Sequence, residues 1–95
     1  MYRIHRTRDF ERSYERLKKS GKFKQQAKGT LIRAINLLAT DMLLPAKFED
    51  HALTGDFQGY RECHIRGDLL LVYQRDEKTR VIDLVDIGSH SQLFG

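Results

Sequence analysis

The fold of this chain is decided by residues 59–73, GYRECHIRGDLLLVY. The first ten of these residues predict a strand that ends in a Gly-Asp turn. Side chains alternate between the two faces of a strand, so Cys63 and Ile65 share one face, which we expect to lie against a core. The closing LLLVY is nearly continuous apolar, as is typical of a central strand that is covered on both sides.

The opposite face of the first predicted strand carries Glu62 and His64, and Asp68 follows just past the turn. Acids and an imidazole presented on a rigid strand form a candidate site for acid–base chemistry. The alternative is a solvated polar face whose histidine has no chemical role.

Length and composition predict one small globular domain, residues 1–95. With 95 residues, 40% hydrophobic and 32% charged, the chain can bury one modest core and is not of the disordered class. No apolar run approaches the roughly 20 residues of a membrane helix, and the N-terminus lacks the apolar stretch of a signal peptide. The single cysteine cannot form an intramolecular disulfide, so we expect a cytoplasmic protein.

Positive charge is concentrated in the first part of the chain. The net charge is +4, but residues 1–40 contain 11 Lys and Arg against 3 Asp and Glu, a balance of +8. Residues 41–95 contain 6 Lys and Arg against 10 Asp and Glu, a balance of −4. This asymmetry favours a phosphate-rich or acidic partner over an ordinary solvated helix face.

Two helices should follow a short edge strand at residues 2–5. Thr7 is a good N-cap, and the apolar stripe after it predicts a helix that ends near Gly21. A second helix is predicted over residues 22–40, antiparallel to the first. With a last strand at residues 81–87, the order β-α-α-β-β-β predicts an α+β fold in which a helix hairpin packs on one face of a mostly antiparallel four-stranded sheet.

Three histidines in the second half of the chain are candidates for proton transfer. His51 lies in residues 45–59, which show no convincing period, His64 lies on the predicted strand, and His90 lies near the last residues. Their separations lack the close pairing of zinc motifs and there is no second cysteine, so the residues do not favour a metal site. The remaining enzymatic interpretation is metal-free cleavage of an RNA phosphodiester, with imidazoles as base and acid.

The second half also contains several segments that are specific as a set: Leu44-Pro45, Glu49-Asp50-His51-Ala52-Leu53, Gly59 to His64, Asp68 to Tyr73, Gly88-Ser89-His90 and Leu93-Phe94. In these segments the chain resembles the RelE/YafQ-like toxins of bacterial type II toxin–antitoxin pairs, and the YafQ branch in particular. The helical half agrees with these toxins in pattern rather than in motif.

This resemblance implies a RelE-like fold and a small endoribonuclease, without metal or cofactor, that cuts mRNA in the A site of the ribosome. It also implies a cognate antitoxin, which we expect to be an acidic, DNA-binding protein. The other partners would be the 70S ribosome and mRNA, and no membrane is involved. We expect ribosomal RNA to contact the basic helices through Lys18, Lys19, Lys22, Lys24 and Lys28.

The resemblance further implies that His51, His64, Asp68 and His90 serve in cleavage and that Phe94 positions mRNA. His90 and Asp68 suit proton transfer, although which is the acid and which is the base stays open. His51 and His64 would stabilise charge on the phosphate, and Phe94 would stack on a base.

Two positions depart from the family pattern. Similar toxins tend to have an arginine four residues before the last histidine, where this chain has Asp86, and an aromatic residue where it has Leu69. Because a carboxylate cannot clamp a phosphate, we expect Arg66 or, preferably, Arg80 to take that role. Glu62 is a further candidate for contact with the substrate.

Two other classes of function stay open. The same scaffold could be a non-catalytic toxin that inhibits a protein target such as gyrase, or a basic RNA-binding domain. The presence of three histidines and of a closing His-x-x-x-Phe favours the enzyme.

Overall fold

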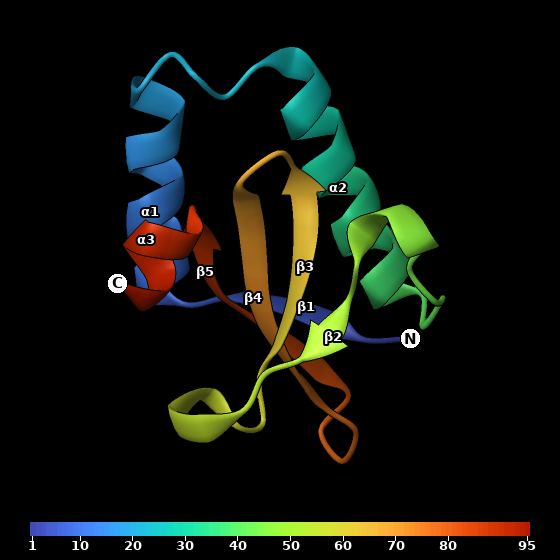
Figure 1. The fold of residues 1–95 in the computed structure, drawn as a ribbon. Helices are drawn as coiled ribbons and strands as arrows, with labels where there is room; N and C mark the ends of the chain where they lie inside the picture. Colours follow the sequence, from blue (N-terminus) through green and yellow to red (C-terminus); the bar gives the residue numbers. More distant parts are fainter.

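The computed structural model describes residues 1–95, which form five strands, three α-helices and two short 3-10 helices (Figure 1). In chain order the elements are β1 (Arg3–Arg6), α1 (Arg8–Lys19), α2 (Gln25–Ala39), η1 (Ala46–Phe48), β2 (His51–Ala52), η2 (Gly55–Phe57), β3 (Arg61–Arg66), β4 (Leu69–Asp76), β5 (Val81–Gly88) and α3 (His90–Phe94). None of the three α-helices has the length and apolar character that crossing a bilayer requires.

The central strand of the sheet is β4. The strand order is β1-β5-β4-β3-β2, in which β1 runs parallel to β5 and the other neighbours pair antiparallel. All four residues from Leu70 to Tyr73 are buried, which confirms the prediction of a strand covered on both faces. The predicted edge position of the first strand is also confirmed, since β1 closes one side of the sheet.

The sheet has one strand more than the four predicted. The additional strand, β2, has only two residues and pairs with β3, which places His51 opposite Glu62. β2 has no buried face of its own and is formed by pairing with β3. Its segment therefore shows no alternation of apolar and polar residues in the sequence. The helix α3 was not predicted either, since five residues are too few to show a helical period.

The first helix begins at Thr7, as predicted. The Thr7 Oγ1 accepts a hydrogen bond from the Phe10 N–H at 3.1 Å, which satisfies one of the free donors of the first turn. The same hydroxyl donates to the carbonyl oxygen of Leu84 at 2.9 Å. Thr7 therefore caps α1 and also ties its start to β5.

The two long helices run antiparallel but are splayed, so the predicted hairpin forms without close packing along its length (Figure 1). α1 packs mainly on β5, whereas α2 packs on β3 and β1. Near the linker the rings of Tyr14 and Phe23 meet edge to face, with centroids 5.6 Å apart. α2 begins at Gln25, three residues later than predicted, because residues 22–24 belong to the linker.

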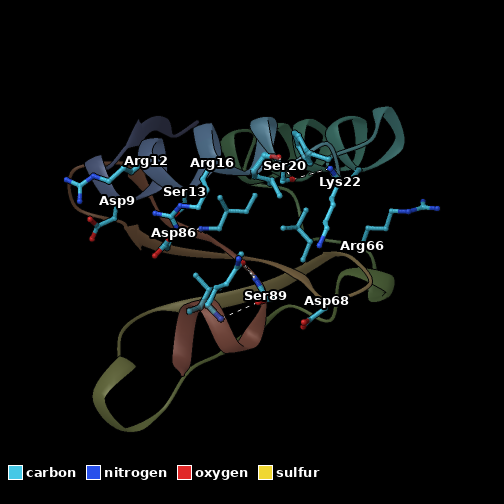
Figure 2. A pocket seen from close by; sticks show the side chains of 18 residues that line it. Asp9, Arg12, Ser13, Arg16, Ser20, Lys22, Arg66, Asp68, Asp86 and Ser89 are labelled. Atoms are coloured by element: carbon cyan, nitrogen blue, oxygen red, sulfur yellow. Dashed lines mark hydrogen bonds between the residues drawn. The ribbon is translucent and has the colours of Figure 1, made fainter.

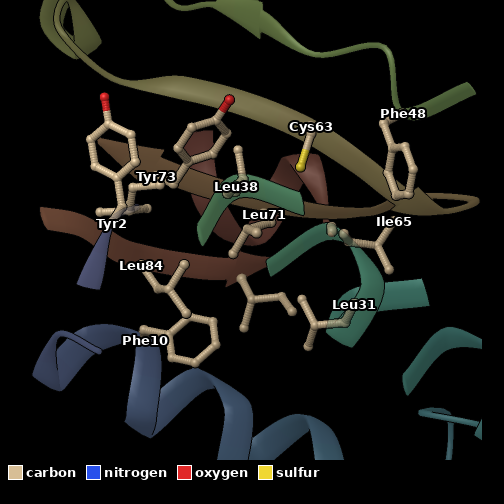
Figure 3. Packing of buried hydrophobic residues seen from close by; sticks show 13 residues of the cluster. Tyr2, Phe10, Leu31, Leu38, Phe48, Cys63, Ile65, Leu71, Tyr73 and Leu84 are labelled. Carbon is tan, nitrogen blue, oxygen red and sulfur yellow. The ribbon is translucent and has the colours of Figure 1, made fainter. Parts of the chain in front are cut away.

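The core lies between these helices and the sheet (Figure 3). It is a cluster of 13 buried residues in which Phe10 from α1 and Leu31 and Leu38 from α2 face Leu71 of the central strand. Cys63 also belongs to this cluster, as its place in the strand alternation predicts. Burial of each large side chain contributes about 1.5–3 kcal/mol.

Replacing Thr7 by Ala should lower the free energy of unfolding by about 1–2 kcal/mol, because the helix cap and the bond to β5 are both lost. Urea denaturation measures the change. Thr30→Ala is the control, since the Thr30 hydroxyl only donates back to Gln26 within α2, and its change should stay below about 0.5 kcal/mol. Equal effects of the two substitutions would contradict the assignment.

Candidate active site

The candidate site lies on the face of the sheet opposite the two long helices. Because Cys63 and Ile65 of β3 are buried in the core, the alternating residues Glu62 and His64 emerge on the other face. The predicted division of β3 into an apolar and a polar face is therefore confirmed.

The register of the sheet brings two more histidines to this face. His51 of β2 is paired directly with Glu62. His64 is paired with Leu70, and Leu70 with Gly88, so this row of the sheet ends two residues before His90. Residues that are distant in the sequence are thus placed side by side by strand pairing.

The three imidazoles converge on one carboxylate oxygen. The Nε2 atoms of His51, His64 and His90 lie 3.4, 3.8 and 3.9 Å from Oε1 of Glu62. The Glu62 side chain is only 3% exposed, so the polar face is not simply solvated. A buried carboxylate costs free energy unless positive charge or donors lie beside it, and protonated imidazoles supply both.

A hydrogen bond fixes the ring of His51. Its Nδ1 lies 2.9 Å from the carbonyl oxygen of Glu49. Because a carbonyl oxygen can only accept, Nδ1 carries the hydrogen, and the neutral ring keeps its lone pair on Nε2, the atom beside Glu62.

A polar network anchors the segment that carries His51. The Tyr73 hydroxyl donates to Oδ1 of Asp50 at 2.5 Å, and Nη2 of Arg61 donates to Oδ2 of Asp50 at 3.0 Å. The hydrogen bond to Asp50 raises the pKa of Arg61, while burial and the bond to Asp50 raise the pKa of Tyr73. Nothing in the spacing of these three residues indicates this network in the sequence.

The short helix α3 places His90 over the site. The Ser89 Oγ accepts from the Gln92 N–H at 3.2 Å, and the Gln92 Oε1 accepts from the Ser89 N–H at 2.9 Å, which is a capping box. A side chain at Gly88 would put its Cβ 2.8 Å from that Gln92 oxygen, so glycine leaves room for the box. The Ser-x-x-Gln spacing is the signal in the sequence that indicates this cap.

Asp68 orients His90 from the β3–β4 turn. Its Oδ1 lies 3.2 Å from Nδ1 of His90 and accepts, at 3.4 Å, from the His90 backbone N–H. The hydrogen bond from the His90 ring and then that from its backbone lower the pKa of Asp68. The ionised carboxylate therefore holds Nδ1–H, and Nε2 faces Glu62.

Two phenylalanines close one side of the site. The rings of Phe57 and Phe94 meet edge to face, with centroids 4.9 Å apart and an interplanar angle of 89°. The Phe94 ring also lies 6.0 Å from that of His90. Phe94 thus lies beside His90, and its ring is packed against another side chain.

The two candidate arginines lie in different places. Arg66 ends β3 and lines a groove beside Asp68. Arg80, the preferred candidate, lies just before β5, whereas His90 lies just after the other end of this strand. At 3.3 Å per residue, the two ends of β5 are roughly 25 Å apart. Arg80 stacks on the ring of Tyr2 at 4.1 Å and donates to its hydroxyl at 3.1 Å, so the prediction for Arg80 was wrong.

A groove of about 890 Å³ leads from this site toward the helices (Figure 2). Asp68 and Ser89 line one side of it, and α1 and the linker after it form the other. Its cationic lining residues are Arg12, Arg16, Lys22 and Arg66, and Lys22 extends into the groove (Figure 2). The other predicted lysines, Lys18, Lys19, Lys24 and Lys28, are exposed on α1, the linker and α2.

Two further kinds of candidate group are the Cys63 thiol and the side chains that could ligate a metal ion. Burial raises the pKa of the Cys63 thiol to about 12, so this thiol is a core residue rather than a nucleophile. As placed, the His, Cys, Asp and Glu side chains form no group of three that could hold a metal ion.

Comparisons with known proteins agree with this fold. The family described as "Bacterial toxin of type II toxin-antitoxin system, YafQ" matches residues 2–95. A metal-bound toxin from Helicobacter pylori is 38% identical and superposes with a TM-score of 0.87 over 99% of this chain and 100% of its own. The toxin in the Escherichia coli DinJ–YafQ complex is 26% identical, with a TM-score of 0.85 and complete coverage of both chains.

Sequence similarity to curated relatives is more local. The mRNA interferase toxin YafQ of Escherichia coli K12 is 36% identical over 59 residues, which are 62% of each chain. The matched segments span less than two thirds of the length of the curated relatives.

The architecture and the family match together define a small α+β bacterial toxin of the RelE/YafQ type. Since the family match covers all but the first residue, the chain belongs to the YafQ family of toxins of type II toxin–antitoxin systems.

Tyr73→Phe should lower the free energy of unfolding by about 1.5–3 kcal/mol, because a buried hydroxyl bonded to a charged group is removed. It should also release the segment that carries His51, seen as faster exchange of that backbone amide. Tyr60→Phe, at a half-buried tyrosine nearby, is the matched control and should change neither quantity. Urea denaturation and hydrogen exchange measure the two effects, and identical results for both variants would show that the network does not anchor His51.

Proposed function

We propose that this protein is a cytoplasmic endoribonuclease that cuts mRNA in the ribosomal A site without a metal ion and is neutralised by a cognate antitoxin. The observation that carries the proposal is the convergence of His51, His64 and His90 on Glu62, with Asp68 on the far nitrogen of His90. RNA cleavage by proton transfer needs a base and an acid on opposite sides of one phosphodiester. The Escherichia coli relative is named an mRNA interferase, which agrees with this chemistry.

His51 is suited to be the base. Its Nδ1–H is held by the Glu49 carbonyl, so Nε2 of the neutral ring is free to take the proton of the ribose 2′-OH. The 2′-oxygen then attacks the phosphorus, and the bond from phosphorus to the 5′-oxygen breaks. This step leaves a 2′,3′-cyclic phosphate on one fragment.

His90 is suited to be the acid. The Asp68 carboxylate stabilises the protonated ring by accepting from Nδ1–H, and Nε2–H can be given to the departing 5′-oxygen. His90 and His51 approach the same oxygen of Glu62, so their Nε2 atoms are close enough to serve one phosphodiester.

Charge on the phosphate is balanced by the remaining cationic groups. A protonated His64, whose Nε2 also lies beside Glu62, can donate to a phosphate oxygen. Arg66 and Lys22 line the adjoining groove and can pair with neighbouring phosphates, which supplies the positive charge that Asp86 does not.

The basic front part of the chain suits both proposed partners. The balance of +8 over residues 1–40 favours ribosomal RNA, and Lys18, Lys19, Lys22, Lys24 and Lys28 are the proposed contacts. It equally favours an acidic antitoxin, and the solved Escherichia coli complex of DinJ with YafQ supports such a partner. One partner would then exclude the other.

His90→Ala should lower the rate of mRNA cleavage on programmed ribosomes by about two to four powers of ten, because the general acid is lost. The free energy of unfolding should stay nearly unchanged, since the His90 side chain is 59% exposed. Antitoxin binding should also persist, because the proposed contacts lie on the basic front part of the chain, residues 1–40. His5→Ala removes another exposed histidine, one that pairs with Asp83 far from the site, and should leave cleavage intact.

The same assay separates the enzyme from a non-catalytic toxin and tests the role of metal. Wild-type toxicity in the His90 variant would contradict catalysis and favour inhibition of a protein target. Toxin that is stripped with chelator and returned to buffer with magnesium alone, which the ribosomes need, should cleave at the full rate. A requirement for added zinc or copper would overturn the metal-free mechanism.

A further inference from the structure

Phe57 is held outside the core by a fixed turn. It ends η2, whose 3-10 geometry is closed by a hydrogen bond from the Phe57 N–H to the Thr54 carbonyl at 3.2 Å. Gly55 and Gly59 take φ values of 64° and 98°, which favour glycine, so the turn is defined by its sequence. Phe57 is nevertheless 37% exposed, and it is not part of the core cluster.

The ring of Phe57 is connected to the catalytic groups through Phe94. The two rings form an edge-to-face pair at 4.9 Å, and the Phe94 ring lies 6.0 Å from the ring of His90. The turn that carries Phe57 comes between His51 on β2 and Glu62 on β3. Phe57 therefore stands at the rim of the site, with its inner side against α3.

In this arrangement the ring that is available for stacking is that of Phe57 rather than that of Phe94. Phe94 is partly buried between Phe57 and His90, whereas Phe57 offers the more accessible aromatic surface. An exposed aromatic ring beside a phosphodiester site is the usual platform for an unpaired base, because every base has a face that can stack. A surface phenylalanine without such a role would only add exposed apolar area.

We propose that Phe57 stacks on a nucleobase of the mRNA beside the scissile phosphate and that Phe94 supports the Phe57 ring from behind. This inference rests on the proposed ribonuclease function. It assigns base contact to the β2–β3 turn and gives Phe94 a positioning role.

Three substitutions at Phe57 test the proposal on ribosomes programmed with mRNA. Phe57→Ala and Phe57→Leu should each lower kcat/KM about 10- to 100-fold, the range expected for one lost stack, and Phe57→Trp should restore it. Leu keeps an apolar side chain against Phe94 but has no aromatic face, so it separates stacking from support of α3. Leu43→Ala, at a 93% exposed side chain outside the site, is the control and should be silent.

A binding measurement gives a readout that does not depend on turnover. An mRNA with 2-aminopurine at each A-site position in turn, and with a 2′-deoxy nucleotide at the cleavage position, should lose fluorescence at one position when wild-type toxin binds. Phe57→Leu should abolish this quenching, and His90→Ala should retain it. Full activity of the Leu variant, or cleavage by wild type without quenching at any position, would overturn the proposal.

Two outcomes separate this inference from neighbouring ones. If Phe57→Ala weakens antitoxin binding while cleavage is unchanged, the ring belongs to a protein interface and the proposal is wrong. If wild-type protein cleaves no mRNA on or off the ribosome, the proposed function itself fails, whereas a Phe57 variant with wild-type kcat/KM overturns only the stacking role.

Discussion

The structure depends most on the pairing of β3 with its two neighbours. Once Cys63 and Ile65 are buried in the core, Glu62 and His64 must emerge on the opposite face. The register with β2 then sets His51 against Glu62, and the row from His64 across the central strand ends at Gly88, just before α3. A shift of one residue in β3 would exchange the core face for the site face, so the register that buries the core also assembles the site.

The buried carboxylate of Glu62 gives this face its chemical character. It is the one charged side chain in the interior, and the nearest ionisable side chains to it are three imidazoles contributed by β2, β3 and α3. Two of these rings are held by a hydrogen bond at Nδ1. The Glu49 carbonyl holds His51, and the Asp68 carboxylate holds His90. The rings are therefore held in fixed orientations, and the proposed electrostatic catalysis depends on such preorganisation.

The sequence was sufficient to predict the elements in which an apolar pattern repeats over several residues. The two helices, the central strand and the two-faced β3 follow from periodicity and from the Thr7 cap, and family resemblance brought the three histidines and Asp68 to one site. Short elements were missed, because β2 and α3 are formed by pairing and capping rather than by a repeated apolar pattern. The prediction for Arg80 was wrong because alternation gives the face of the sheet on which a residue lies and not the end of the strand.

In the proposed mechanism, Glu62 gathers the three histidines into a working site. Glu62→Gln tests it most directly, because the shape of the side chain is kept and its negative charge is removed; Glu49→Gln, at an exposed residue near His64, is the matched control. The measurement is the single-turnover rate of mRNA cleavage on programmed ribosomes, with folding checked by amide spectra. We expect the Glu62 variant to fold and to lose at least about a hundredfold in rate, because preorganised electrostatic support is removed. The Glu49 variant should stay near wild type. A folded Glu62 variant that cleaves at the wild-type rate would contradict this mechanism.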